Sequence, residues 1–305
     1  MPDRLNWDDL RLVQAIAETR SLGGAADRLG LNHSTVFRRL GALEDQLRLK
    51  LFERARVGYA ATPEGAEMVA LARRMADDVL DFERKIAGGD AKPSGELRIA
   101  TNDSMVAYLL PPVLARFREA YPDIRLDMVV GNQPLNLSRR DADVALRATD
   151  TPPDTLVGRR IASIAWAIYA APEVLARYGD PWRADAPWIG YGEALASVPA
   201  VRMINERVAV ERIVYRTSTV VGQIEAAAAG VGFSCAPCFV GEIDARVVRC
   251  NEPQAEIGRG LWLLTHPDLR HSARVRAFME FVGAELTRRR RLIEGAAAPA
   301  PAPAA

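Results

Sequence analysis

The stretch NHSTVFRRLGALEDQL, residues 32–47, carries the pattern of a short amphipathic helix. Its polar side chains Ser34 and Arg38 point away from a narrow apolar stripe, formed at spacings of four, three and four by Val36, Leu40, Leu43 and Leu47. Asn32 is expected to cap the helix. Hydroxyl and guanidinium groups near a helix start can donate to guanine edges or hold phosphates when the helix lies in the major groove of DNA. The stretch therefore predicts a DNA-reading helix, with a merely solvated polar face as the alternative.

Two shorter helices precede this stretch. Asn6 is expected to cap the first, and Ser21 the second, which covers residues 22–29. Gly30 supplies the turn into the third helix. The pair Gly23-Gly24 is unfavourable inside a helix, which predicts that another helix approaches closely there. The order of helix, turn and helix is typical of a helix-turn-helix module.

A short hairpin follows the third helix. Residues 51–54 form an apolar anchor, and residues 55–62 form an Arg- and Gly-containing hairpin that can serve as a wing beside the groove. Eight basic residues stand against four acidic ones between Arg20 and Gly58, although the whole chain has a formal net charge of only +1. Ser34 and Arg38 are expected to face bases, and the wing arginines phosphates. The candidate DNA-binding residues are Ser21, His33, Ser34, Thr35, Arg38, Arg39, Arg54 and Arg56.

A series of short motifs runs in fixed order through the first 65 or so residues: Asp9-Leu10-Arg11, Ser21-Leu22-Gly23-Gly24-Ala25-Ala26, Leu29-Gly30-Leu31, Ser34-Thr35-Val36-Phe37-Arg38-Arg39-Leu40, Leu43-Glu44, Leu51-Phe52-Glu53-Arg54 and Thr62-Pro63-Glu64-Gly65. Their order and spacing resemble the winged helix-turn-helix of the LysR-type bacterial transcriptional regulators. The resemblance continues to about residue 290 through Ser94-Gly95-Glu96-Leu97-Arg98-Ile99, Gly230-Val231-Gly232 and His266-Pro267-Asp268-Leu269. It implies a periplasmic-binding-protein-like effector domain, a dimer formed through a linker helix and, usually, a tetramer.

Two residues depart from the pattern of that family. The family often has a small hydroxyl residue at the place of Phe37 and a small polar residue or Ala near Gly24. Phe37 lies about 100° from the apolar stripe. We expect it to pack on the wing, with contact to a thymine methyl as the alternative, and in either case a phosphate contact there is lost. Gly24 makes the second helix less stiff.

A longer helix, residues 63–87, follows the hairpin and is closed by Gly88-Gly89. Its apolar positions repeat at alternating spacings of four and three, which is the seam of a coiled coil. Because a helix-turn-helix normally reads two half-sites as a dimer, dimerisation is favoured over packing of this helix on its own domain. The expected dimer contacts are Met68, Met75, Val79, Phe82 and Ile86, with Ala72 in the same seam.

Beyond residue 95, strand-like runs alternate with helical ones, at 97–100, 105–120, 124–130 and 142–146. A second set of strands covers about 165–245, and a strand at 261–265 and a helix at 272–286 then bring the chain back. The fold class is therefore α/β, with an N-terminal winged helix-turn-helix, a linker helix and a two-lobed effector domain. The expected boundaries are 1–62 for the DNA-binding domain, 63–89 for the linker helix, 90–94 for a hinge, 95–290 for the effector-binding domain and 291–305 for a disordered tail.

Two polar clusters stand where a strand meets a helix, one in each expected lobe. They are Thr101-Asn102-Asp103-Ser104 and Arg216-Thr217-Ser218-Thr219. Free N–H groups at a helix start suit an anion, although simple capping explains either cluster alone. Clefts at the carboxyl ends of parallel strands bind small ligands, so a small polar or anionic effector is expected there. The candidate effector-binding residues are Thr101, Asn102, Ser104, Arg147, Ser218 and Thr219.

Other function classes receive little support. Cys235 and Cys238 form a CxxC whose apolar neighbours favour buried thiols over a redox switch, and no fourth zinc ligand is recognisable. No nucleophile and base pair is visible, so we expect no enzyme activity, no metal and no cofactor. The first 20 residues lack the apolar core of a signal peptide, and no run of about 18–20 apolar residues exists, which predicts a cytoplasmic protein without a membrane partner.

The sequence thus predicts a sequence-specific DNA-binding transcription regulator whose operator binding is modulated by a small-molecule effector in the cleft. The alternative is a cytoplasmic small-molecule sensor of the solute-binding type with no sequence-specific role on DNA. The expected partners are double-stranded DNA with two half-sites, the effector, further copies of the chain in a homodimer or homotetramer, and RNA polymerase.

Overall fold

The computed structural model describes residues 5–55, 58–86, 92–131, 142–196 and 198–296; the side chains of residues 74, 77, 78, 80–86 and 194 lie outside the description. The chain divides into two compact units, Met1–Ala91 and Lys92–Ala305, and each is described by itself.

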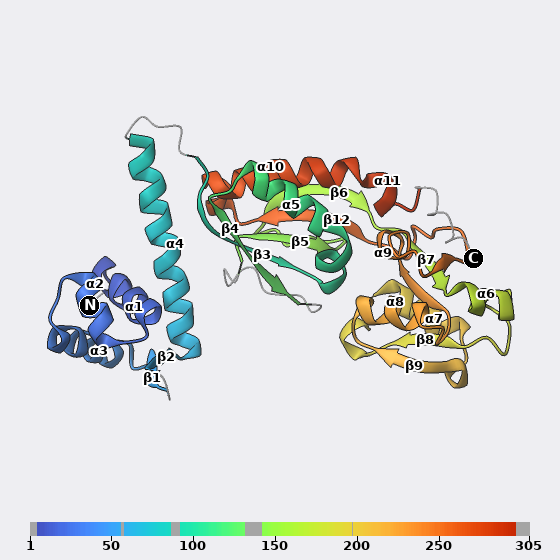
Figure 1. The fold of residues 1–305 in the computed structure, drawn as a ribbon, viewed down its shortest axis with the longest axis horizontal. Helices are drawn as coiled ribbons and strands as arrows, with labels where there is room; N and C mark the ends of the chain where they lie inside the picture. Colours follow the sequence, from blue (N-terminus) through green and yellow to red (C-terminus); the bar gives the residue numbers. More distant parts are fainter. Residues whose placement is uncertain (1–4, 56–57, 87–91, 132–141, 197, 297–305) are drawn as a thin grey trace. The chain divides into compact units, whose positions relative to one another are not determined.

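The first unit is a helical module with a small hairpin (Figure 1). Its elements are α1 (Trp7–Thr19), α2 (Leu22–Leu29), α3 (His33–Leu47), β1 (Phe52–Arg54), β2 (Tyr59–Ala61) and α4 (Pro63–Ile86). The two strands pair antiparallel, with Phe52 opposite Ala61. The apolar faces of α1, α2 and α3 meet in one core, in which Val13, Ile16 and Val36 are fully buried. The helices lie where the sequence predicts them. The wing hairpin begins earlier than predicted, because its first strand, β1, lies within the stretch 51–54 that was expected to be only an apolar anchor.

Side-chain caps explain where two of these helices begin. The side-chain amide oxygen of Asn6 accepts from the Asp9 N–H at 3.0 Å, and the Ser21 hydroxyl accepts from the Gly24 N–H at 2.9 Å, so both predicted caps are confirmed. Asn32 stands at the N-cap position of α3, as predicted, but its side chain makes no capping hydrogen bond. Its backbone carbonyl accepts the N–H groups of Thr35 and Val36.

The expectation for the glycine pair of α2 holds for one residue only. A Cβ on Gly24 would lie 2.8 Å from the Cβ of Thr19, the last residue of α1, so a neighbouring helix does come close. A Cβ on Gly23 would meet nothing within 4 Å, so close approach does not explain this glycine.

Buried polar contacts join α3, the wing and α4. The Glu44 carboxylate accepts the N–H groups of Leu51 at 2.9 Å and Phe52 at 3.3 Å. The Thr62 hydroxyl donates to the Lys50 carbonyl and accepts from the Gly65 N–H, which caps the start of α4. A Cβ on Gly65 would stand 1.9 Å from the Leu51 carbonyl oxygen, so only glycine permits this approach of helix to wing. The wing is thereby held at a fixed place beside α3.

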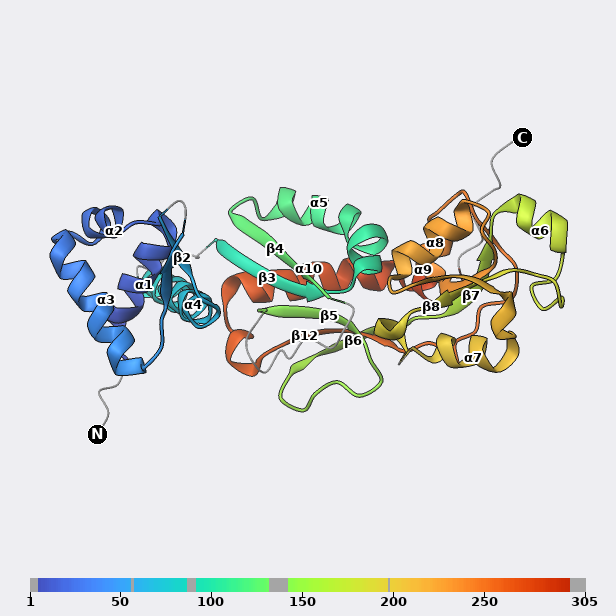
Figure 2. The same ribbon diagram turned by 90° about the horizontal axis from the view of Figure 1, so that it is seen from below.

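The second unit contains two lobes. The first lobe is a five-stranded sheet in the order β4-β3-β5-β12-β6, with β3 (Gly95–Thr101), β4 (Ile124–Val130), β5 (Val144–Ala148), β6 (Val157–Ser163) and β12 (Gly260–Thr265). β3 is parallel to β4 and β5, whereas β12 is antiparallel to β5 and β6. α5 (Pro111–Ala120) and α10 (Ala273–Arg288) pack together on this lobe (Figure 2). The rings of Phe117 on α5 and Phe278 on α10 lie 5.2 Å apart.

The second lobe is built from short strands. β7 (Trp166–Ala170) lies between β10 (Ser234–Pro237) and β11 (Val248–Arg249), and β8 (Trp188–Tyr191) pairs parallel with β9 (Ile213–Thr217). The helices of this lobe are α6 (Pro172–Tyr178), α7 (Pro199–Arg207), α8 (Val220–Ala228) and α9 (Cys238–Gly241). Two crossing segments join the lobes, and the Ile164 N–H donates to the Arg259 carbonyl between them at 2.8 Å. The two-lobed α/β architecture is confirmed.

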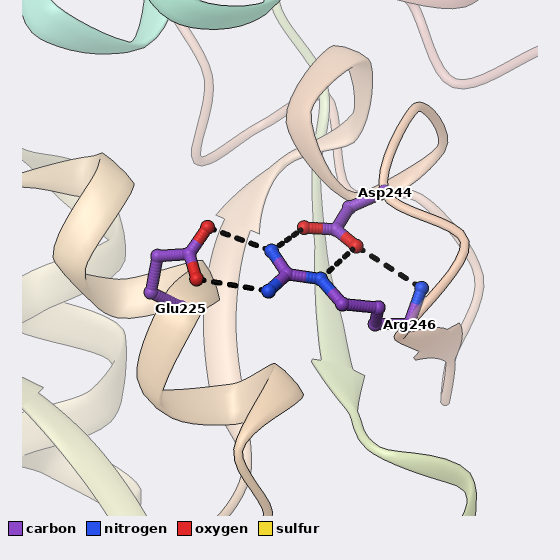
Figure 3. A network of polar contacts seen from close by, with 3 residues as sticks. All are labelled: Glu225, Asp244 and Arg246. Atoms are coloured by element: carbon purple, nitrogen blue, oxygen red, sulfur yellow. Dashed lines mark hydrogen bonds and ion pairs between the residues drawn. The ribbon is translucent and has the colours of Figure 1, made fainter.

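Arg246 ties α8 to the segment that follows α9 (Figure 3). Its guanidinium donates to both oxygens of Glu225 on α8, at 2.6 and 3.0 Å, and to Asp244, at 2.7 and 3.0 Å. The hydrogen bond from Arg246 lowers the pKa of the Asp244 carboxyl, although burial opposes the shift. This network links α8 to the segment after α9 at the surface of the lobe.

Two predicted segments differ in detail. Residues 105–120 are not one α-helix, because Met105–Leu109 forms a π-helix before α5 begins at Pro111. Residues 291–296 are not part of a disordered tail, because α11 (Arg290–Ile293) packs Ile293 into the core with no exposed surface. The remaining tail, residues 297–305, lies outside the described residues.

Candidate nucleic-acid interface and effector cavity

The outer face of α3 presents polar groups to solvent. His33, Ser34, Arg38 and Arg39 are exposed, and Thr35 is half-buried beside the buried Val36. Arg38, Arg39 and Arg54 form no ion pair with any residue that the structure describes, whereas Arg28 on α2 is paired with Glu18 at 2.6 Å. The guanidinium groups of α3 and the wing are therefore available to an external anion.

The start of α2, α3 and the wing enclose a shallow depression. Four predicted residues, Ser21, His33, Ser34 and Arg54, line it together. Thr35, Arg38 and Arg39 lie outside it on the same helix, and Arg56 falls outside the described residues. Phe37, for which a DNA contact was the alternative prediction, also lines it, with Gly58 and Tyr59 of the predicted wing. Arg20, Leu22 and Gly23 complete the lining and were not predicted. For Arg20, the signal was its place directly before the capping Ser21.

Backbone contacts hold the wing beside this depression. The Tyr59 N–H donates to the Arg20 carbonyl at 2.9 Å. Gly58 has a φ of +75°, and a Cβ on it would lie 2.1 Å from the same carbonyl oxygen, so the wing requires glycine here. The loop before α2 and the wing thus present Arg20 and Arg54 on one surface.

The seam of α4 divides into two parts. Met68 is 7% exposed and, with Val69 and Ala72, packs into the core of its own unit. The prediction of Met68 as a dimer contact is therefore wrong, because the apolar face at this point is already covered by α1 and its neighbours. Met75 and Val79 remain 37% and 44% exposed. The side chains of Phe82 and Ile86 lie outside the described part of α4.

A cavity of about 300 Å³ lies between the lobes of the second unit, at the carboxyl ends of β3 and β5. Asn102, Ser104 and Arg147 line it from the first lobe, as predicted. The rest of the lining was not predicted. It is largely apolar, with Met105, Leu156, Ile164, Trp166, Leu195, Val198, Val220, Phe239 and Leu264, and it also includes Asp103, Thr149, Thr151 and, as a second cation, Arg259. Ile164 and Arg259 belong to the segments that cross between the lobes. Because such segments pass the cleft, their position in the sequence could have indicated that these residues line it.

Arg147 is the more deeply placed cation of this cavity. Its guanidinium donates to the Gly131 carbonyl at 3.3 Å, and burial lowers its pKa. Arg259 stands 3.9 Å from the carboxylate of Asp150, which lies at the surface. A cation held away from water in a mainly apolar cavity is stabilised when an anion binds beside it.

Three predicted effector residues do not line the cavity. Thr101 is fully buried and its hydroxyl donates to the Met105 sulfur, because its side chain points into the first lobe. Thr219 caps α8 by accepting from the Gly222 N–H, and Ser218 is exposed beside Gly192. The start of α8 also meets an anion of the chain itself, since the Val221 N–H donates to the Asp103 carboxylate at 3.2 Å. The expectation that these three residues line the cleft is therefore wrong.

The cysteines lie inside the second lobe. Cys235 and Cys238 are fully buried and free, as expected. Burial raises the pKa of Cys238 to about 11 and that of Cys250 to about 12, so these thiols stay protonated near neutral pH. Within the described ranges, no three His, Cys, Asp or Glu side chains are grouped as a metal site requires.

None of the described helices combines the length and the apolar character that crossing a membrane requires.

Comparison with known proteins links both units to one family. The family model described as LysR substrate binding domain matches residues 90–287, and the model described as bacterial regulatory helix-turn-helix protein, lysR family, matches residues 7–66. The transcriptional regulator CrgA of Neisseria meningitidis is 31% identical over 182 residues, which cover 60% of this chain and 61% of that protein. DmlR of Escherichia coli is 26% identical over 57% of each chain. The match thus spans about three fifths of these curated relatives.

Solved structures match over nearly the full length. The structure of CrgA from Neisseria meningitidis covers 93% of this chain and 99% of its own, with a TM-score of 0.57 and 25% identity. LysG of Corynebacterium glutamicum, solved with bound effector Arg, covers 92% and 99%, with a TM-score of 0.61. At 21% identity, the likeness to LysG concerns the fold alone.

Proposed function

Because the chain belongs to the family of LysR-type transcriptional regulators, we propose that it regulates transcription by binding a specific DNA sequence through α3 and the wing. The observation that carries this proposal is the outer face of α3, where Ser34, Arg38 and Arg39 are exposed and Ser34 lines the depression shared with the wing. Helices placed in this way enter the major groove with their N-terminal residues on base edges, while adjoining cations contact phosphates.

The test is a selection from a library of random-sequence DNA duplexes with the full-length chain. We expect repeated rounds to enrich one motif in two copies related by a two-fold axis, about 10 bp or a multiple of that apart. A double variant, Ser34→Ala with Arg38→Ala, should enrich no motif although it keeps the fold. Failure of the wild-type chain to enrich any sequence would refute the proposal.

The cavity of the second unit is the proposed effector site. Its walls are mainly apolar, and the polar groups come from Asn102, Asp103, Ser104, Arg147, Thr149, Thr151 and Arg259. We therefore propose an organic acid with an apolar body as the effector, with its carboxylate on Arg147. A ligand that touches both lobes binds one arrangement of the lobes more tightly than another. This difference in ligand affinity is what allows the ligand to change the affinity of the chain for DNA.

Dimerisation through the exposed part of α4 is the proposed assembly. Met75 and Val79 lie four residues apart on one helix face and leave apolar surface in water. A second copy of the chain that covers them would bring two α3 helices to two half-sites. Higher assembly into a tetramer and contact with RNA polymerase remain predictions from the family resemblance.

A further inference from the structure

One aromatic side chain of the DNA-binding unit stands apart from the core. Phe37 on α3 is 60% exposed, more than any other large apolar side chain in the described part of this unit. It does not belong to the apolar cluster of this unit, whereas Tyr59 of the wing packs against that cluster. Phe37 lines the depression beside the wing residues Arg54, Gly58 and Tyr59, and most of its ring still faces solvent, where it can meet something outside the chain.

The helix geometry gives Phe37 a definite place. It lies about 60° around α3 from Ser34 and about 100° from Arg38. Side chains on a helix lean toward its N-terminus, so the ring covers the turn of His33 and Ser34. Gly41, one turn further along, leaves the other side of the ring open. Phe37 therefore stands in the N-terminal half of the helix, the half that approaches base edges in a helix-turn-helix complex.

The charges around Phe37 favour DNA over a protein partner. The ring lines the depression together with the two cations Arg20 and Arg54. A cationic rim of this kind matches the phosphates that border a groove. Within the major groove, the 5-methyl group of thymine is the apolar group that base edges present. An apolar centre inside a cationic rim thus matches a thymine flanked by phosphates.

From this arrangement we infer that Phe37 is a specificity-determining residue that packs against a thymine 5-methyl group in each half-site. The inference rests on the proposed function, because it requires that α3 enters the major groove. It selects thymine at one position by apolar contact, where the hydrogen-bonding residues Ser34 and Arg38 select other bases.

The test replaces thymine by uracil, one position at a time, in the duplex selected by the wild-type chain. This change removes the methyl group and keeps every hydrogen-bonding group. At one thymine position of the half-site, the substitution is expected to lower the affinity of wild type about fourfold for each half-site that carries it. This factor corresponds to the transfer free energy of one buried methylene group. Phe37→Ala should bind the thymine duplex more weakly and show no further loss with uracil, whereas Phe37→Leu should retain most of the discrimination.

The controls separate this inference from the proposed function. Because Phe37 is exposed, Phe37→Ala should keep the thermal midpoint of wild type. Wild-type selection of a motif followed by indifference to uracil at every thymine would overturn the inference alone. So would equal uracil losses in wild type and Phe37→Ala, or unchanged affinity of Phe37→Ala for the thymine duplex, which would place the ring against a protein. If wild type selects no motif, the proposed function fails first.

Discussion

Arg38 and Arg54 are both exposed arginines of the first unit, yet their surroundings differ. Arg38 stands on the outer face of α3 about 40° from Ser34, and Arg54 stands on the wing. Arg38→Ala should reduce the free energy of binding to the selected duplex by about 1–3 kcal/mol and relax the sequence preference at one base pair. Arg54→Ala should weaken binding to all sequences alike. It should also reduce by about one the slope of the logarithm of the binding constant against the logarithm of the salt concentration. Salt titrations of both variants on specific and random duplexes measure this difference.

Arg183→Ala is the matched control, because it removes an exposed arginine of the second unit that is paired with Asp185. It should leave both affinities unchanged. Equal losses of Arg38→Ala on specific and random DNA would remove Arg38 from the reading of bases.

Glu44 provides a test of stability. Burial raises its pKa, but hydrogen bonds from Lys50 and from the N–H groups of Leu51 and Phe52 outweigh burial and hold the pKa below its ordinary 4.5. The carboxylate therefore stabilises the folded state at pH above 4.5, and this contribution is lost as the pH falls through the lowered pKa. Glu44→Gln should lower the free energy of unfolding by about 1–2 kcal/mol at neutral pH and change it little at a pH below the lowered pKa of Glu44. Urea unfolding at both pH values measures it, and an equal cost at both would contradict the account.

Residue roles could be predicted where the local chain decides them. Asn6 and Ser21 cap their helices because a cap needs only the N–H groups two or three residues on. Thr101 and Ser218 were wrongly placed in the cleft, because the direction of a side chain at a strand end depends on the packing of distant segments. The apolar walls of the cavity were missed for the same reason, since Ile164 and Phe239 look like ordinary core residues in sequence.

At the scale of elements, helix α4 shows what a periodic pattern can decide. The spacing of four and three predicts the helix and its apolar face, and both are present. The same pattern serves packing within a chain and between chains, so it could not show that Met68 and Ala72 belong to the unit's own core. Exposure of Met75 and Val79 now restricts the proposed dimer contact to the second half of the helix.

Val79→Asp tests this contact. A charge in an apolar interface should shift the chain toward the monomer and lower its affinity for a duplex with two half-sites, without loss of folding, because Val79 is exposed. Ala66→Asp, an exposed position about 140° away around α4, is the control and should change neither. Analytical ultracentrifugation and DNA titration measure both. A Val79→Asp chain that still dimerises and binds as wild type would show that α4 packs only within its own chain.

The π-helix before α5 also belongs to this scale. Pro111 and Pro112 have no N–H to donate, so a continuous α-helix through residues 105–120 would lack hydrogen bonds there. The chain instead closes a wider turn, in which the Leu110 N–H donates to the Met105 carbonyl, and α5 starts afresh with proline in its first turn. The two prolines were a signal for this break that periodicity alone did not use.

At the scale of the whole molecule, one chain combines the proposed DNA-reading unit with the proposed ligand-binding unit. Arg147→Met keeps an apolar side chain of similar length and removes the cation from the cavity. Its affinity for an aromatic or branched-chain carboxylate that binds wild type should fall about 10- to 100-fold, the effect of losing a charge-assisted hydrogen bond. Calorimetry measures it, with Ser218→Ala as a control that should bind as wild type. Unchanged affinity in Arg147→Met would place the effector elsewhere.

A regulator of this kind must distinguish one DNA sequence from others. The ratio of the dissociation constants of the full-length chain for its selected duplex and for a shuffled duplex of the same composition, at physiological salt, measures this property. We expect a preference of at least about 10³ for the selected duplex. A ratio near one, with both affinities falling equally as salt rises, would refute sequence-specific binding by this chain.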